Sequence, residues 1–145
     1  MGNRAVITTN KKLNDIGVYL HWNGGRDSVE AFLAYCDLKG YRKPENDGYG
    51  LAMLINVITN FFGDGLSCDV NTCSHLDCNN YDNGVYVIKD WRIIGRKYEP
   101  SEEQYDHDFV DFIMEIDKHQ PKDMRLNAIE KDRILEVYDD VKKYR

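Results

Sequence analysis

The sequence lacks a long hydrophobic run, an excess of positive charge and an internal repeat. No apolar stretch approaches the roughly 20 residues that a membrane-spanning helix needs. The polar start, Met1-Gly2-Asn3-Arg4, is not typical of a signal peptide. We therefore expect a cytoplasmic protein without a membrane anchor, folded as a single domain over residues 1–145.

Basic residues are in the minority. The chain has 19 Lys and Arg against 25 Asp and Glu, which gives a formal net charge of −6. Nonspecific binding to a phosphate backbone depends on a basic surface. We therefore expect no direct binding to nucleic acid.

Cysteine is scarce, and cysteines in a cytoplasmic chain are reduced thiols or metal ligands rather than disulfides. Cys68, Cys73, His75 and Cys78 lie close together, and structural zinc prefers such ligands. Their spacing does not match the ligand pairs of common zinc modules, and His75 follows Cys73 too closely for an easy tetrahedral site. The interpretation favours unpaired thiols, with no metal and no cofactor.

Hydrophobic residues make up 42% of the chain and aromatic residues 12%, which argues against disorder. Hydrophobic periodicity predicts helices over 27–40 and 51–62 and two more, one before and one after Pro121. The expected strands cover residues 4–9, 16–22, 66–70, 85–88 and 93–98. A polar turn over residues 10–15 is expected to join the first two as a hairpin, and the last two are expected to turn around residues 89–92. Because this order has no βαβ rhythm, we predict an α+β fold: a mainly antiparallel sheet of about five strands packed with about four helices.

Three details of the helices follow from the same patterns. Residues 51–62 are apolar on nearly every side, so we expect them to form the buried central helix. The helix before Pro121 is expected to begin at Ser101, with Gln104 three positions further on. The last helix is expected to turn one apolar set inward: Leu126, Ile129, Leu135, Tyr138 and Val141.

The stretch from Gly17 to Glu30 is expected to form a strand, a glycine turn and the start of a helix. Asn23-Gly24-Gly25 can adopt positive φ at little cost, and we expect at least one of the two glycines to do so. Asp27 or Ser28 is expected to cap the helix, because Asp27 and Glu30 have the spacing of a capping box.

This junction also groups the candidate ligand-binding residues. Backbone N–H groups beside a helix N-terminus can bind an anion, and Arg26 adds a cation. Under this hypothesis a nucleotide or another phosphate-bearing ligand binds at His21, Trp22, Asn23, Gly24, Gly25 and Arg26. His21 would be the general acid or base if the site is hydrolytic. The alternative is a purely structural turn with Trp22 in the core.

Two further surfaces are candidates for binding a protein. Acidic residues crowd the helix before Pro121, and such a face can imitate nucleic acid and occupy a basic groove. At the expected hairpin tip a Trp stands beside an Arg, and these residues often dominate interfaces. The alternatives are a solvated helix face and a Trp that folds back over the sheet. The candidate partner-binding residues are Asp90, Trp91, Arg92, Glu103, Asp106 and Asp111.

The segments Met1-Gly2-Asn3-Arg4-Ala5-Val6-Ile7 and Tyr19-Leu20-His21-Trp22-Asn23-Gly24-Gly25 resemble a family of small bacteriophage, prophage and mobile-element proteins. The likeness extends through the helix that begins near Asp27 and the turn at Asp82-Asn83-Gly84-Val85-Tyr86. It ends before the charged C-terminal helices. The resemblance implies no catalytic residue, but it does imply a setting inside a host cell, where such proteins bind host proteins or sequester signalling molecules.

The leading hypothesis is therefore a phage or mobile-element accessory protein in the host cytoplasm that inhibits a host defence protein by binding it, without catalysis. A nucleic-acid-binding defence component is one candidate partner, and self-association into a homo-oligomer stays open. A nucleotide- or phosphate-binding protein that uses the junction is the alternative. A regulatory module stabilised by zinc is the third hypothesis.

Overall fold

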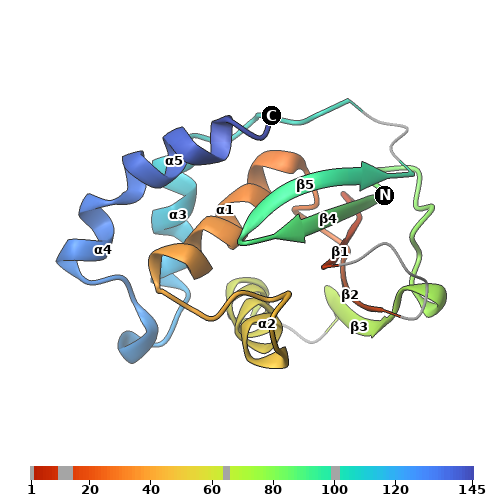
Figure 1. Ribbon diagram of the computed structural model, residues 1–145, viewed down its shortest axis with the longest axis horizontal. Helices are drawn as coiled ribbons and strands as arrows, with labels where there is room; N and C mark the ends of the chain where they lie inside the picture. Colours follow the sequence, from red (N-terminus) through yellow and green to blue (C-terminus); the bar gives the residue numbers. More distant parts are fainter. Residues whose placement is uncertain (1, 10–14, 64–65, 99–101) are drawn as a thin grey trace.

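Five strands form one mixed sheet, and the helices gather on one side of it (Figure 1). The computed structural model describes residues 2–9, 15–63, 66–98 and 102–145. The strands are β1 (Ala5–Thr8), β2 (Ile16–Leu20), β3 (Cys68–Thr72), β4 (Val85–Lys89) and β5 (Arg92–Lys97). The helices are α1 (Arg26–Leu38), α2 (Gly48–Phe62), α3 (Phe109–Lys118), α4 (Ala128–Asp132) and α5 (Ile134–Lys142), with short 3-10 helices η1 (Cys73–His75) and η2 (Lys122–Met124).

The strand order across the sheet is β3-β2-β1-β4-β5. The pair β1–β4 is parallel, and the other three neighbouring pairs are antiparallel. β1 and β2 pair with Ile7 opposite Val18, as the expected hairpin requires. Residues 10–14, which were expected to form its turn, lie outside the described residues. The predicted α+β fold with a mainly antiparallel sheet is confirmed.

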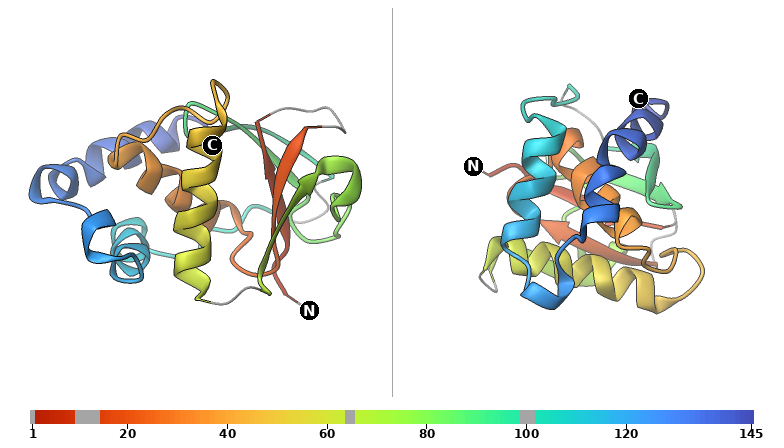
Figure 2. Two further views of the ribbon diagram at one scale, coloured as in Figure 1. Left: turned by 90° about the horizontal axis from the view of Figure 1, so that it is seen from below. Right: turned by 90° about the vertical axis from the view of Figure 1, so that its left-hand side faces the viewer.

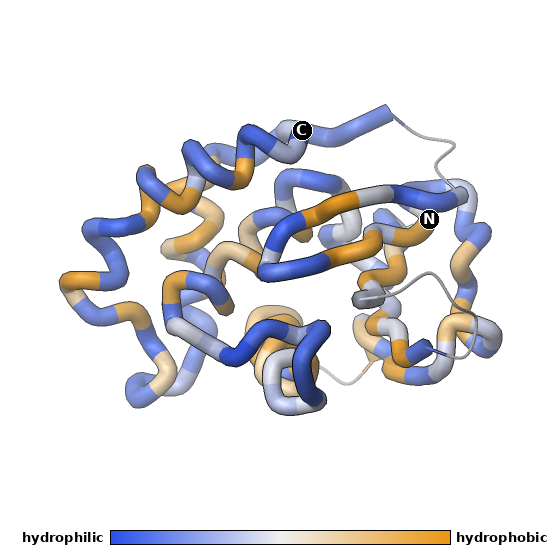
Figure 3. The backbone as a smooth tube through the Cα atoms, viewed as in Figure 1, coloured by the Kyte–Doolittle hydropathy of each residue, from blue (hydrophilic) through white to orange (hydrophobic). Residues whose placement is uncertain are grey.

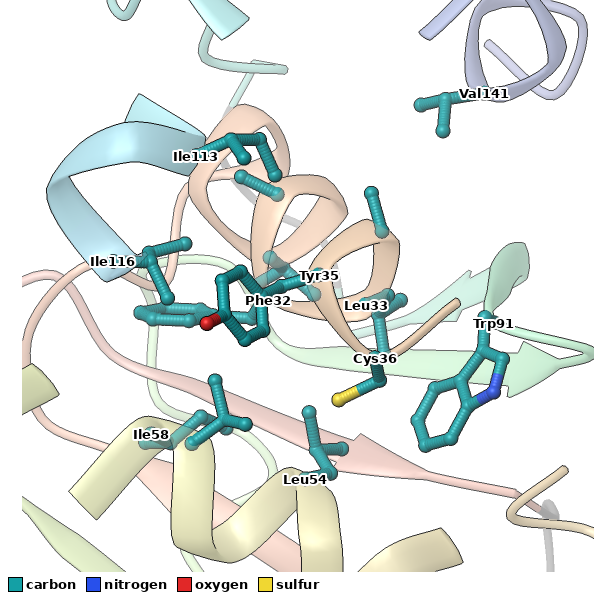
Figure 4. Packing of buried hydrophobic residues seen from close by; sticks show 14 of the residues in the cluster. Phe32, Leu33, Tyr35, Cys36, Leu54, Ile58, Trp91, Ile113, Ile116 and Val141 are labelled. Carbon is teal, nitrogen blue, oxygen red and sulfur yellow. The ribbon is translucent and has the colours of Figure 1, made fainter. Parts of the chain in front are cut away.

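α1 is the central helix, because every one of its residues except Asp37 is buried. It lies between the sheet on one side and α3 and α5 on the other (Figure 2). Figure 4 shows its side chains surrounded by those of α2, α3, α5 and the turn between β4 and β5. Phe32, for example, meets the rings of Phe61 and Phe112 at centroid distances of 5.3 and 5.9 Å.

Residues 51–62 form a helix as predicted, but the prediction that this helix is the buried central one is wrong. The helix exists as α2, but it covers one edge of the core, and its buried residues are Gly50, Leu54, Val57 and Ile58. Its end at Gly63 is as expected, with a left-handed φ of 71°. Hydropathy measures what each residue prefers, whereas burial depends on how many neighbouring elements cover it, and α1 has more of them.

The C-terminal region breaks into two helices at Arg133, which closes α4 and opens α5. Figure 3 shows that most residues along α4 and α5 are hydrophilic, with hydrophobic residues spaced between them. After the break, Ile134, Val137 and Val141 are the buried residues of α5. The inward orientation expected for Ile129 and Leu135 is wrong, since these side chains are 75% and 64% exposed.

The sheet face opposite the helices carries a small core of its own. Val6, Val85 and Cys73 are buried there, with Tyr19, Leu76 and Cys78 packed against them. The segment that follows β3 covers this face, at the outer side of the sheet in Figure 2. The polar segment after β3 therefore also contributes apolar side chains to a core.

The turn between β4 and β5 has only two residues, Asp90 and Trp91. Asp90 and Trp91 both have positive φ, 52° and 61°, as the central residues of a type I′ hairpin turn must. A Trp in this conformation is strained. It is held there because its indole is only 2% exposed and its Nε1 donates to Tyr41 O at 3.1 Å. The expectation that Trp91 is exposed is wrong, and the alternative, that it folds back, is what the structure shows.

Truncation of this side chain should therefore affect stability rather than binding. We expect Trp91→Ala to lower the free energy of unfolding by about 3–5 kcal/mol, the usual cost of removing a buried Trp. Ile94→Ala, on the adjacent strand at 51% exposure, is the matched control and should cost less than about 1 kcal/mol. Urea denaturation of both variants measures the difference, and equal stabilities would contradict the burial of Trp91.

Candidate functional site

The junction between β2 and α1 turns at Asn23 rather than at a glycine. Asn23 has a φ of 55°, whereas Gly25, the N-cap residue of α1, has a φ of −64°, and Gly24 is not among the residues with positive φ. The prediction that one of these glycines needs positive φ is therefore wrong. Asn tolerates this conformation better than most residues, which explains why the turn forms one position earlier.

Gly24 and Gly25 are instead required because other segments pack directly onto them. A Cβ on Gly24 would lie 2.5 Å from Asn3 O, and one on Gly25 would lie 2.5 Å from Gln104 Oε1. The N–H of Gly24 also donates to Asn3 O at 2.8 Å. The glycines thus allow the N-terminal segment and residues 102–108 to meet at the start of α1.

Arg26 is buried, and protein groups occupy its guanidinium. Its Nε lies 3.2 Å from Glu30 Oε2, its Nη1 lies 3.4 Å from Glu103 Oε1, and its Nη2 donates to Tyr144 O at 2.7 Å. A phosphate would have to displace two carboxylates to reach this cation. These contacts do not favour the phosphate-binding hypothesis.

His21 and Trp22 lie at the outer end of the junction. Trp22 is 46% exposed, so the alternative that it belongs to the core is wrong. Its ring meets His21 edge-on at 4.9 Å, and His21 Nδ1 lies 2.9 Å from the Tyr19 hydroxyl.

Asp27 does not cap α1, because α1 begins before it, at Arg26, and its N-cap residue Gly25 has no side chain to cap with. The capping-box prediction for Asp27 and Glu30, and the alternative cap at Ser28, are wrong. The buried carboxylate of Asp27 instead binds residues 106 and 107. Its Oδ2 accepts from the backbone N–H groups of Asp106 and His107 at 2.7 and 2.8 Å, and from His107 Nδ1 at 2.9 Å.

His107 is the residue that sequence reasoning missed. Its only local signal is a place beside Asp108, the N-cap of α3, and its partner Asp27 is 80 positions away. Because the carboxylate can only accept, Nδ1 carries a proton, and Nε2 is an acceptor in the neutral imidazole. Nε2 has no protein partner among the described residues.

The expected acidic helix begins later than predicted. Ser101 lies outside the described residues, residues 102–108 run as a non-helical segment, and Asp108 caps α3 by accepting from the N–H of Asp111 at 2.9 Å. Glu103 contacts Arg26 and Arg96, so it ties this segment to the core. Of the acidic candidates, Asp111 lies on the helix and is exposed, whereas Asp106 precedes it.

The α2–α3 groove is a cavity of about 360 Å³ on the surface beside His107. Phe61 and Phe112 line it with stacked rings, 5.6 Å apart at an angle of 27°. Its lining residues are Asn23, Phe61, His107, Asp108, Asp111, Phe112 and Glu115. It therefore joins one residue of the predicted junction site, Asn23, to one of the predicted partner-binding residues, Asp111.

The hairpin tip does not form an open binding surface. Only Asp90 is exposed; its N–H is shared by the carboxylate of Glu45, and its side chain lies 3.3 Å from Lys43 Nζ. Arg92 is 7% exposed and forms ion pairs with Asp37 at 2.9 Å and Asp140 at 2.8 Å. Trp91 and Arg92 thus join the hairpin to α1 and α5.

The four zinc candidates are divided between the two faces of the sheet. Cys68 packs against the main core, and burial raises the pKa of its thiol to about 11. Cys73 and Cys78 belong to the core of the opposite face, and burial also raises the pKa of Cys78. Zinc binds thiolates, which these environments disfavour. Within the described ranges, no three His, Cys, Asp or Glu side chains converge on a position that could hold a metal ion.

Comparison of the chain with protein-family models, with curated proteins and with solved structures finds no match. None of the helices in the described part of the chain is long and apolar enough to cross a membrane.

The close packing at Gly24 gives a direct test of the junction. We expect Gly24→Ala to destabilise the protein by about 1–3 kcal/mol, because the new Cβ would overlap backbone atoms of the N-terminal segment. Gly48→Ala is the matched control: nothing lies within 4 Å of its Cβ position, and the change should be neutral or slightly stabilising. Thermal unfolding compares the two, and an unaffected Gly24 variant would refute the close approach.

The buried carboxylate of Asp27 is the second test. Asp27→Asn places an amide among four N–H donors, three from residues 106 and 107 and one from Ser28, so we expect a loss of about 2–5 kcal/mol. Amide hydrogen exchange at residues 106 and 107 should become faster in this variant. Asp139→Asn, whose side chain is 76% exposed, should change neither measurement. Unchanged exchange at residues 106 and 107 would show that Asp27 does not hold this segment.

Proposed function

We propose that this chain is an accessory protein of a bacteriophage or another mobile element, and that it acts by binding a host protein rather than by turnover. A host defence protein is the partner class we put forward. The resemblance of the N-terminal segment and the junction to phage and prophage proteins supports the setting, and the α2–α3 groove supports the mode of action.

The observation that carries the proposal is the combination of an aromatic floor and an acidic rim in one surface groove. Phe61 and Phe112 supply apolar surface, and Asp108, Asp111 and Glu115 supply negative charge beside it. Interfaces gain affinity from buried aromatic contacts and gain association rate from complementary charge. A host protein with a basic, partly apolar segment fits both properties.

The overall charge supports the same class of partner. At a net charge of −6, the chain attracts basic surfaces over distances of about a Debye length, roughly 8–10 Å at physiological salt. Basic surfaces are common on proteins that bind nucleic acid, and many defence proteins must do so. Arg26, the cation of the junction, is in contrast already paired with carboxylates of the protein.

The test compares two charge-reversal variants in the host. Asp111→Lys with Glu115→Lys changes the groove, and Glu136→Lys with Asp139→Lys makes the same change of charge on α5. We expect a host protein that co-purifies with the unchanged chain and with the α5 variant to be lost with the groove variant. With the purified partner, the groove variant should bind at least about tenfold more weakly and associate more slowly.

Equal loss of the partner in both variants would mean that net charge alone attracts it. Retention in both would place the interface elsewhere. Either result contradicts the proposal that the groove is the binding site.

A further inference from the structure

The α2–α3 groove is large enough to hold one side chain of a partner. Its volume of about 360 Å³ is at the low end of the roughly 300–1,000 Å³ typical of ligand pockets. The occupant must therefore be small, and its chemistry must match the groups that line the groove.

The ionisable groups of the groove are arranged to accept hydrogen bonds. Asp108, Asp111 and Glu115 provide carboxylates, and Asp27 binds His107 at Nδ1, which leaves Nε2 as an acceptor in the neutral imidazole. Lys118 pairs with Glu115 at 3.0 Å, whereas Asp108 and Asp111 have no ion pair within the described ranges. An acceptor-rich, negatively charged site fits a ligand that is cationic and can only donate.

Two cationic groups of proteins can only donate hydrogen bonds, the guanidinium of Arg and the ammonium of Lys. The aromatic rings of the groove favour the guanidinium. Phe61 and Phe112 are stacked with each other, and His107 meets Phe112 edge-on at 4.5 Å. A planar guanidinium stacks on aromatic faces and donates five N–H groups in a fixed fork, whereas an ammonium is a more strongly hydrated point charge. The positive end of the α3 dipole opposes any cation here, but it amounts to about half a charge against the two carboxylates of Asp108 and Asp111.

We propose that the α2–α3 groove binds the guanidinium group of an arginine side chain that a protein partner presents. Asp111 and Asp108 accept from its N–H groups, His107 Nε2 accepts from one more, and the Phe61–Phe112 pair supports its plane. This assignment rests on the proposed function only in taking the partner to be a protein.

The test uses capped tripeptides and the whole folded chain. Amide NMR spectra of the labelled protein are recorded while N-acetyl-Gly-Arg-Gly-amide is added, and saturable shifts are expected at Asn23, His107, Asp111 and Phe112. The corresponding lysine peptide should bind several-fold more weakly. The citrulline peptide, which has nearly the same shape without the charge, should bind at least about tenfold more weakly.

Matched variants locate the effect. Asp111→Asn should weaken binding of the arginine peptide about tenfold, because it removes a charge-assisted acceptor, while Asp139→Asn on α5 should leave it unchanged. The dispersion of the NMR spectrum shows whether each variant is folded. The absence of saturable shifts, equal binding of the lysine or citrulline peptide, or full binding by a folded Asp111→Asn variant would overturn the assignment.

The two proposals can fail separately. If the arginine peptide does not bind but the groove charge reversal still abolishes the host partner, the proposed function stands and the guanidinium assignment is wrong. If the peptide binds and no host partner depends on the groove, the assignment stands and the proposed function is wrong.

Discussion

The buried charges in the first turns of α1 bind residues 103–107 and the last two residues of the chain to this helix. Asp27 binds the backbone at residues 106 and 107, and Arg26 contacts Glu103 and Tyr144. Glu30, 3% exposed, is bound by both Arg26 and Arg145. Because α1 is covered on every side, these groups have no water to replace a lost partner, and removing one partner leaves a buried charge uncompensated.

These buried contacts determine which polar groups remain available to bind a ligand. The strand-to-helix junction has the composition of a ligand site. However, Arg26 is paired with carboxylates of the protein, and other segments fill the space next to Gly24 and Gly25. The same contacts fix His107 against Asp27 at the wall of the α2–α3 groove. Asn23, at the edge of the junction, is the one predicted ligand-binding residue that lines this groove. The structural role of the junction and the proposed binding role of the groove are therefore linked through one carboxylate.

Local patterns predicted most of the elements but not which of them is central. Alternation identified β2, apolar and β-branched residues identified β1, and hydrophobic periodicity identified α1. The more apolar α2 was expected at the centre, because periodicity describes one face of a helix at a time. α1 is central because Ala31, Ala34 and Tyr35 on its other sides are buried as well and α3 and α5 pack against it, which no local pattern records. Likewise, the break at Arg133 turns Leu135 away from the core.

For this protein, the sequence by itself determined the α+β class, the antiparallel hairpins, the extents of α1 and α2 and the acidic charge. These properties depend on residues close together in the chain, where propensity and periodicity act. Only the tertiary structure decided that Trp91 and Arg92 are buried, that Arg26 is occupied, and that Asp27 positions His107 beside Asp111 and Phe61. The physical reason is that desolvation and pairing depend on which distant segments cover a residue, and residues 27 and 107 meet only after the whole chain has packed around α1.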